Sequence, residues 1–327
     1  MALARKRMRF VARRLAQSIP LLIAVIVLNF FLLKLAPGDA ASVFAGQSGS
    51  SSPEYMAKLR HQFGLDVPTH VQLINYVTNI LTLDLGYSFR NQMTVAALIF
   101  DRLAATLLLM GTALLISVVL GVLLGLIAAM RVRTWKDNVI SVFSVVVYAM
   151  PTFWIGLMLI VVFSIKLEWF PATGMESVAM FNTGWDRVAD IATHLVLPSV
   201  TLSLLYMAVY TRLMRGSVLE NSNMDYVTTA RAKGLTESSV TFRHIVRNAI
   251  LPVVTMAGVQ LGNLLGGSVV VEAVFGWPGI GQLAFQAIFA RDMSLLLGIF
   301  LISACLVIVV NLLVDLLYTF LDPRMDL

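Results

Sequence analysis

The sequence predicts an all-α membrane protein that crosses the bilayer several times. Of its 327 residues, 58% are hydrophobic and only 13% are Asp, Glu, Lys or Arg, which is about half the charged share of an ordinary soluble domain. The apolar residues form long continuous runs. Because a lipid-facing backbone must form its hydrogen bonds within its own segment, runs of this length are expected to be helices and not barrel strands.

Six segments approach the roughly 20 apolar residues that a spanning helix needs. They cover 15–36, 103–130, 139–165, 195–211, 250–271 and 293–321. The second and third contain no charged residue, and the fourth is the shortest, with Pro198 near its start. The first is too long for the apolar part of a cleaved signal peptide, so we expect it to be retained as a transmembrane helix.

Positive charge predicts the orientation of these segments. Six basic residues and no acid precede the first segment, and sixteen of the 24 Lys and Arg residues fall on that same side if the segments alternate in direction. Cytoplasmic loops keep an excess of Lys and Arg. We therefore expect six transmembrane helices with the N- and C-termini in the cytoplasm. The expected parts are a basic cytoplasmic N-terminus (1–14), a first transmembrane helix (15–36), a periplasmic segment with short helices (37–102), a core of five transmembrane helices (103–321) with a long cytoplasmic loop (214–248), and a cytoplasmic C-terminus (322–327).

Several kinds of chemistry have no support in the sequence. The chain has no Gly-x-x-x-x-Gly-Lys-[Ser/Thr] motif for nucleotide phosphates, and the pair Gly121 and Gly125 lies inside an apolar helix, where it predicts a packing face. The four histidines are dispersed, so we expect neither a metal site nor a catalytic site. Basic residues alternate with apolar runs and form no nucleic-acid stripe. Ionisable residues are absent from the middle of five spans, which disfavours a proton-coupled carrier.

Polar side chains within the spans have two interpretations. The buried amides expected there either form hydrogen bonds between helices or line a path through the membrane; they are Asn29, Gln260, Asn263 and Asn311. As translocation-path candidates we select Gln260 and Asn263 in the fifth span and Met150 and Pro151 in the third.

The long cytoplasmic loop has the signals of two short helices. Asp225 can cap a helix that runs to Lys233, and Gly234 can end it in a left-handed conformation. A second helix can begin at Thr236 or Ser238. It would carry three apolar residues on one face, Phe242, Ile245 and Val246. An ordinary amphipathic surface loop is the alternative.

Two stretches of this loop resemble the cytoplasmic coupling motif of ABC importer permeases, in the variant of the dipeptide, oligopeptide and nickel branch. They read Tyr226-Val-Thr-Thr-Ala-Arg-Ala-Lys-Gly-Leu235 and Arg247-Asn-Ala-Ile-Leu-Pro252. The Glu-Ala-Ala opening of other importers is replaced by Thr228-Thr229-Ala230. Further motifs follow the family's order: Ala36-Pro-Gly-Asp39, Phe63-Gly-Leu-Asp-x-Pro68, Leu83-Asp-Leu-Gly-Tyr-Ser88, Arg102-Leu-x-x-Thr106, Met150-Pro-Thr-Phe153, Trp169-Phe-Pro-Ala-Thr-Gly174, Glu272-x-x-Phe-Gly-Trp-Pro-Gly-Ile-Gly281, Arg291-Asp292 and Asn311-Leu-Leu-Val-Asp-Leu-Leu-Tyr318.

The resemblance implies a type I ABC importer permease, a non-catalytic multi-pass subunit in the bacterial inner membrane. In this family the loop docks as a short coupling helix on an ATPase subunit. The implied ATPase-coupling residues are Asp225, Thr228, Thr229, Ala230, Arg231, Ala232, Lys233, Gly234 and Leu235. ATP and Mg would be bound by two partner ATPase subunits, and this chain would bind no cofactor. The other implied partners are a second homologous permease, a periplasmic substrate-binding protein and membrane lipid.

Three questions stay open at this point. The implied substrate is a dipeptide or short oligopeptide, with nickel or a nickel chelate as the alternative. The permease pair can be a heterodimer or a homodimer. Outside the family, a stand-alone channel or a secondary carrier is the competing class of function.

Overall fold

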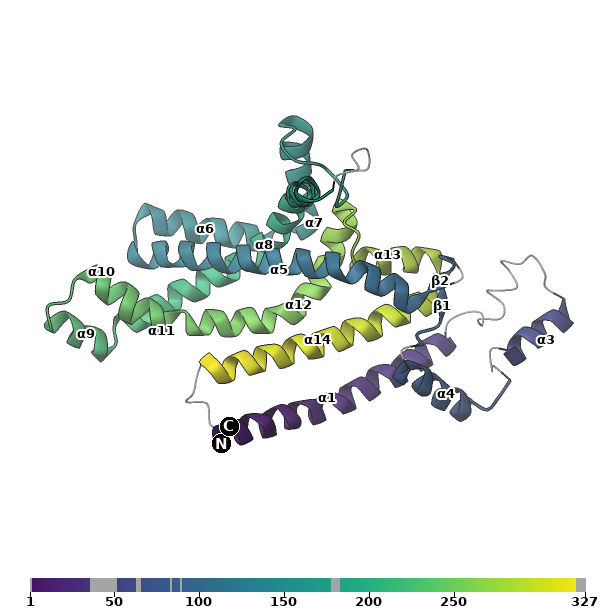
Figure 1. The fold of residues 1–327 in the computed structure, drawn as a ribbon. Coiled ribbons are helices and arrows are strands. Elements are labelled where there is room, and N and C mark those ends of the chain that lie inside the picture. Colours follow the sequence, from purple (N-terminus) through teal and green to yellow (C-terminus); the bar gives the residue numbers. More distant parts are fainter. Residues whose placement is uncertain are drawn as a thin grey trace. The chain divides into compact units, whose positions relative to one another are not determined.

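The computed structural model describes residues 2–35, 52–62, 66–82, 84–88, 90–177 and 183–321 (Figure 1). The predicted all-α class is confirmed, with one addition. Within these residues the sequence analysis missed a two-stranded antiparallel hairpin, in which β1 (Tyr87–Ser88) pairs with β2 (Met93–Thr94). The chain divides into two compact units, Met1–Leu103 with Leu283–Leu327 and Ala104–Gln282.

The first unit is built on the helices α1 (Ala2–Leu35) and α14 (Met293–Leu321), which pack along each other. The buried Asn29 amide nitrogen of α1 donates a 3.2 Å hydrogen bond to the Leu297 carbonyl of α14. Asn29 therefore joins two helices, whereas Asn311, which we also expected to be buried, is exposed.

Among the described residues, three shorter helical segments also belong to this unit. They are α3 (Pro53–Gln62), α4 (Thr69–Leu81) and the end of α13 (Ile280–Ala290). In α1, helical backbone already begins at Ala2, so much of the basic stretch that we separated as 1–14 continues the first helix. Lys and Arg are good helix formers, which explains the earlier start.

The second unit contains the long helices α5 (Val95–Met130), α8 (Trp185–Ser222) and α12 (Leu251–Phe275), of which α5 begins in the first unit. The glycine pair on α5 forms a packing face, as predicted. A Cβ atom added at Gly121 would lie 2.5 Å from Cβ of Tyr210, and one at Gly125 would lie 2.6 Å from the Thr211 carbonyl oxygen. Both contacts are on α8, so small residues permit the close approach of α5 and α8.

The third predicted span is bent, which corrects the expectation of one continuous helix over 139–165. Helix α6 (Trp135–Ala149) is followed by α7 (Thr152–Leu159) and the π-helical segment η1 (Ile160–Lys166), at an angle of 106°. Met150 is extended, with φ −80° and ψ 138°. Proline disfavours helical backbone at the residue before it and donates no backbone hydrogen bond, so Pro151 breaks the helix here.

The fourth and fifth spans are also longer than predicted. Helix α8 covers 38 residues and extends far beyond the predicted 195–211, because the polar stretches on both sides continue the helix. Helix α12 ends at Phe275, and a second bend of 78° separates its last turns, Ser268–Phe275, from α13.

By length and composition, three helices of the described residues can cross a membrane, or up to five if each bent pair counts as one span. The apolar part of α1, Ala16–Leu32, is shorter. The number of six spans therefore remains a prediction, as does the cytoplasmic location of the termini.

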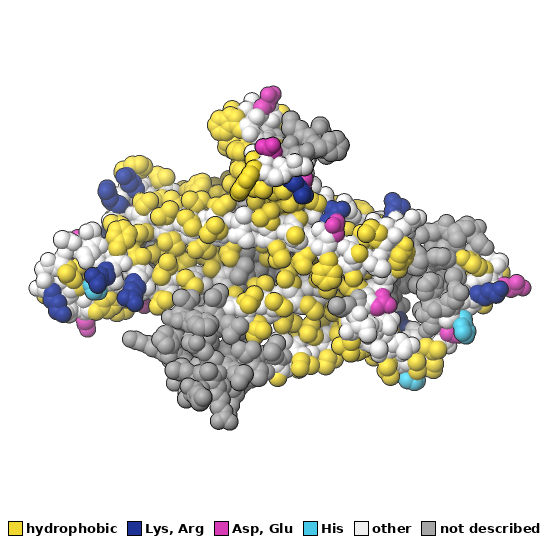
Figure 2. Space-filling view, viewed as in Figure 1, with side chains coloured by type: hydrophobic (Ala, Val, Ile, Leu, Met, Phe, Trp, Pro, Cys, Tyr) yellow, Lys and Arg dark blue, Asp and Glu magenta, His cyan; other side chains and the backbone are white. Residues whose placement is uncertain are grey.

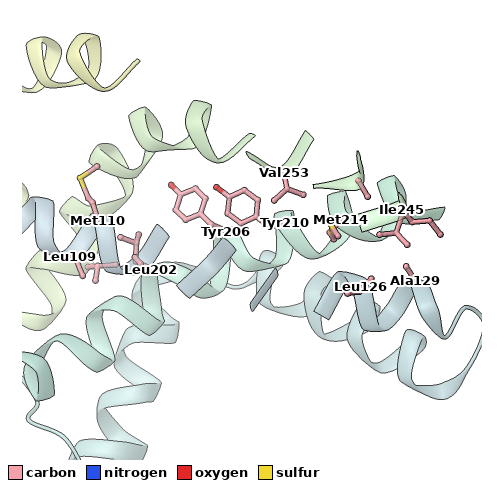
Figure 3. Close-up of a cluster of buried hydrophobic side chains, with 14 of the residues drawn as sticks. Leu109, Met110, Leu126, Ala129, Leu202, Tyr206, Tyr210, Met214, Ile245 and Val253 are labelled. Atoms are coloured by element: carbon pink, nitrogen blue, oxygen red, sulfur yellow. The ribbon is translucent and has the colours of Figure 1, made fainter. Parts of the chain in front are cut away.

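A core cluster of buried apolar side chains runs through the second unit (Figure 3). It joins Leu109 and Leu126 of α5 to Tyr206 and Met214 of α8, and it reaches Ile245 beyond α8. Apolar side chains also cover much of the visible surface in Figure 2. On α5 and α6 the exposed ones include Leu115, Val119, Leu123, Val139, Val142 and Val146. An apolar exterior of this kind fits a lipid environment.

Candidate functional site

Helix α9 (Asp225–Ala232) occupies the position predicted for the first short helix of the loop 214–248. Its end matches the prediction. Gly234 is left-handed with φ 76°, its N–H donates to the Arg231 carbonyl, and the N–H of Leu235 donates to the Ala230 carbonyl. These two bonds define a Schellman motif. Its start differs, because the extended N-cap is Met224 and Asp225 is the first helical residue, with no capping side-chain hydrogen bond.

The turn after α9 leads directly into the next helical stretch. Thr236 is the N-cap of α10 (Glu237–Ser239), which continues into the π-helical η2 (Val240–Val246) and α11 (Arg247–Ala249). The Arg231 guanidinium donates two hydrogen bonds to the Glu237 carboxylate, at 2.9 and 3.2 Å. This exposed fork connects the two sides of the Gly234 turn, and its net contribution to stability is small at the surface.

Two faces of α9 have different surroundings. Val227 is fully buried and Ala230 is 4% exposed, and both belong to the core cluster of the second unit. Ala230 therefore faces the protein's own core, which corrects our expectation that it lies on the docking face. The other predicted coupling residues are exposed: Asp225, Thr228, Thr229, Arg231, Ala232, Lys233, Gly234 and Leu235.

The stretch after Gly234 holds α9 on the core through residues that are four or five apart. Val240, Ile245 and Ala249 are buried, whereas Phe242 is 60% exposed. We expected Phe242 and Ile245 on one face from the α-helical period. The π-helical turns of η2 change that period, so Val240 replaces Phe242 on the buried face. Figure 3 shows Ile245 beside Met214 of α8.

Sequence reasoning missed an ion pair near this loop. Asp137 at the start of α6 is 3% exposed and accepts hydrogen bonds of 2.7 and 2.8 Å from the Arg215 guanidinium of α8. It also accepts a 3.0 Å bond from the N–H of Arg133. The available signal was a single acid in an otherwise basic turn. The pair fixes the start of α6 to the helix that leads into α9.

The translocation-path candidates are only partly brought together by the structure. Gln260 is half-buried on α12, and Asn263 lies one turn further along that helix, with its side chain outside the described ones. Met150 is half-buried and Pro151 exposed, both at the bend after α6. Helix α12 packs against α7, which begins directly after this bend. Their role in the path remains a prediction.

A second missed feature is a buried polar joint at the bend after α12, which we call the Glu272 joint (Thr106, Glu272 and 276–282). The Glu272 carboxylate is fully buried. It accepts a 2.9 Å hydrogen bond from the Thr106 hydroxyl of α5 and a 3.0 Å bond from the N–H of Gln282, and the N–H of Gly281 and the Ser268 hydroxyl also donate to it. Every oxygen is thus supplied with donors, as a buried carboxylate requires.

Backbone bonds complete the Glu272 joint. The Thr106 hydroxyl accepts a 2.8 Å bond from the N–H of Ile280, and the buried Trp277 indole donates a 2.9 Å bond to the Ala105 carbonyl. Gly276 ends α12 with φ 59°. The motif residues of the sequence analysis therefore meet at one place, where they fix α12 and the start of α13 to α5.

These observations define a class of protein: a helical membrane protein with bent helix pairs and a short exposed helix, α9, held on its core. A solved structure with a similar fold is that of the MetNI methionine ABC transporter in inward-facing conformations. Its match has a TM-score of 0.55 at 16% identity and covers 69% of this chain and 96% of the solved chain.

Comparison with known sequences gives the family. The model of the binding-protein-dependent transport system inner membrane component matches residues 121–327, and the model of its N-terminal region matches residues 7–110. The chain is 38% identical to a putative peptide transport system permease protein of Brucella abortus (strain 2308) over 314 residues, 96% of this chain and 98% of the relative. It is also 38% identical to the oligopeptide transport system permease protein AppB of Bacillus subtilis (strain 168) over 318 residues, 97% of this chain and 99% of AppB. A dipeptide transport system permease protein of Alkalihalophilus pseudofirmus is 35% identical, and the match covers 96% of this chain and 98% of the relative.

The chain belongs to the family of binding-protein-dependent transport system inner membrane components. It is therefore a multi-pass permease of an ABC importer in the bacterial inner membrane, as the sequence analysis expected.

Proposed function

We propose that this chain is one of two permease subunits in an ATP-driven importer of dipeptides or short oligopeptides. In this proposal it is joined by a second homologous permease, two ATPase subunits and a periplasmic substrate-binding protein. The peptide relatives support the choice of substrate. The chain supplies no phosphate-binding motif of its own, so ATP and Mg belong to the partner subunits.

The observation that carries the proposal is the construction of α9. Its exposed face presents Thr228, Thr229, Arg231 and Lys233, while Val227 and Ala230 fix the opposite face to the core. A short helix held in this way can enter a groove on another protein without having to fold first, which lowers the cost of binding. The exposed face is the proposed ATPase contact.

Packed side chains and an ion pair connect α9 to the membrane helices α8 and α6, so a displacement of α9 can be transmitted to them. Val227 and Ala230 belong to the same buried cluster as Met214 of α8, and Arg215 of α8 connects to Asp137 at the start of α6. We propose that ATP-driven closure of the ATPase subunits displaces α9 and that α8 and α6 move with it. The two permeases would then alternate between outward and inward openings, with Gln260, Asn263, Met150 and Pro151 beside the path.

Reconstitution tests this function. The tagged chain would be purified from native membranes in mild detergent, its co-purifying subunits identified by mass spectrometry, and the complex placed in vesicles. We expect an ATPase and a second permease in the complex, and uptake of labelled di- to pentapeptides that requires both internal ATP and the external binding protein. Uptake by the chain alone without ATP would instead support a channel or secondary carrier. Absence of a second permease from an active complex would favour a homodimer.

A further inference from the structure

Helix α4 has an unusual composition for an extramembrane helix. Its 13 residues, Thr69–Leu81, include no Asp, Glu, Lys or Arg. At about 3.6 residues per turn, its side chains divide into three sectors. Tyr76 and Ile80 share one sector, Ile74 and Leu81 the second, and the polar Asn75 and Asn79 the third.

The first sector faces the protein. The Tyr76 ring lies 5.8 Å from the Phe30 ring of α1, and burial raises the pKa of the Tyr76 phenol above its usual value. Tyr76 and Ile80 line a small pocket with Ser294 and Leu297, in the first turns of α14. At the N-terminus of α4, the Lys34 ammonium donates a 2.9 Å hydrogen bond to the Thr69 hydroxyl.

These contacts place α4 at one end of two membrane helices. Phe30 and Lys34 lie in the last turns of α1, and Ser294 and Leu297 lie in the first turns of α14. Since α1 and α14 are antiparallel partners whose ends meet α4, the short helix lies beside the ends of both.

The second sector is apolar and uncovered. Ile74 is 61% exposed and Leu81 is 77% exposed. They lie about two helical turns apart on the same face of α4. His70, in the first turn, lies toward this side and is exposed. The third sector, with Asn75 and Asn79, is also exposed. A helix with an apolar sector beside a polar one can lie in the plane of a membrane interface with its apolar side inserted.

We propose that α4 lies in the lipid headgroup region, with Ile74 and Leu81 inserted among the acyl chains. The apolar sector is continuous with the bilayer boundary set by α1 and α14, and it would be buried to a depth of about 5–10 Å. Lipid is favoured over a docking protein as the occupant, because α4 offers no charge to steer or orient a protein partner. An anchored α4 would hold the outer ends of α1 and α14 at a fixed depth.

Site-directed spin labelling tests this placement. The full-length chain with its accompanying subunits would carry single cysteines in a Cys305→Ser background and be reconstituted in vesicles of phosphatidylethanolamine and phosphatidylglycerol. Labels at Ile74→Cys and Leu81→Cys would be compared with matched labels at Asn75→Cys and Asn79→Cys. Collision with oxygen, which concentrates in lipid, would be measured against collision with a water-soluble nickel chelate.

We expect the oxygen-to-nickel ratio to be severalfold higher at Ile74 and Leu81 than at Asn75 and Asn79. Equal ratios at all four positions, or low collision with both reagents at Ile74 and Leu81, would overturn the proposal; the second result would indicate a protein cover. If a labelled variant does not fold, Leu81→Trp provides a second measurement. Its fluorescence should be quenched by brominated lipid and not by aqueous iodide, and the reverse pattern would contradict lipid contact.

Discussion

Two helices of the second unit end at a left-handed glycine, one in an exposed turn and the other in a buried turn. Gly234 ends α9 and Gly276 ends α12, and both are left-handed, with φ 76° and 59°. Nothing lies within 4 Å of a Cβ atom added at Gly234, whereas one at Gly276 would contact Thr173 and the Gly174 nitrogen at 3.7 Å. The residues that follow differ in the same way: Leu235 is exposed and Trp277 is fully buried.

The comparison distinguishes two reasons for a glycine at these turns: the backbone conformation that both turns need, and the packing around only one of them. Both turns need a residue that tolerates positive φ, at a cost of about 1 kcal/mol for most side chains. Only the Glu272 joint adds steric and hydrogen-bond constraints, since its groups are satisfied within the chain. The free space at the Gly234 turn is available to another protein. We therefore expect changes at the joint to reduce stability and changes at the α9 turn to reduce coupling.

The largest effect on stability is expected for Gly281→Ala in the Glu272 joint. The added Cβ atom would lie 2.6 Å from Cα of Val269 and 2.9 Å from Oε2 of Glu272. Overpacking against backbone, combined with a displaced buried carboxylate, should cost about 3 kcal/mol. Thermal unfolding of the purified protein measures this. Gly266→Ala on α12 is the matched control, because nothing lies within 4 Å of its added Cβ, and an equal loss there would refute the role of crowding.

Ala230→Glu should have the next largest effect on stability. We expect this loss to be confined to α9 and not to unfold the whole protein. Ala230 is 4% exposed, so a carboxylate there would be buried without a partner, which is strongly unfavourable. We expect α9 to detach from the core and become cleavable by protease, while the membrane helices stay folded. In Ala232→Glu the new charge is exposed, so α9 should stay protease-resistant and only ATPase binding should weaken. Identical protease patterns would contradict the two-faced description of α9.

A smaller loss is expected for Thr106→Val. The substitution keeps the shape but leaves the Ile280 N–H without its 2.8 Å acceptor and removes one donor to Glu272. An unsatisfied buried donor costs about 1–3 kcal/mol, so the unfolding temperature should fall. The control is Thr112→Val, whose hydroxyl bonds only to carbonyls of its own helix. A comparable fall in the control would mean that the joint adds nothing specific.

The smallest effect on stability is expected for Arg231→Ala. Its fork with Glu237 is exposed, and surface ion pairs of this kind contribute about 0–1 kcal/mol. The unfolding temperature should therefore change little. Because Arg231 belongs to the proposed ATPase contact, retention of the ATPase subunit should fall, and Glu237→Ala shows how much of that fall comes from the broken fork. If Arg231→Ala retained the ATPase subunit at the normal level, Arg231 would not be part of the proposed ATPase contact.

The two turns also differ in how far the sequence could predict them. The α9 turn depends on residues within one short stretch, and Gly234 after Ala232 and Lys233 is a local signal, so its helix and left-handed end could be predicted. The Glu272 joint could not, because Thr106 and Glu272 are 166 residues apart and no local pattern relates them. Their motifs were visible only as a resemblance.

Other errors have equally physical causes. The bend at Pro151 was not predicted because the run over 139–165 is apolar on both sides of the proline. Apolar composition does not show whether the helix axis changes direction. Phe242 was grouped with Ile245 on one helix face because the α-helical period was applied to a π-helical segment. Ala230 was placed on the docking face because its small side chain gave no sign of the core beneath α9.

The most direct test of the proposed coupling is Gly234→Val, with Ser239→Ala on the same loop as the matched control. Valine meets no neighbour in the free chain but strongly disfavours φ 76°, so the α9 turn should change shape while the membrane helices stay folded. Membranes from each variant would be assayed for protein level, retained ATPase subunit and peptide uptake. We predict a normal level of Gly234→Val with ATPase attachment or uptake largely lost, and near-normal values for Ser239→Ala. Full uptake by Gly234→Val at a normal protein level would show that α9 is not the coupling element.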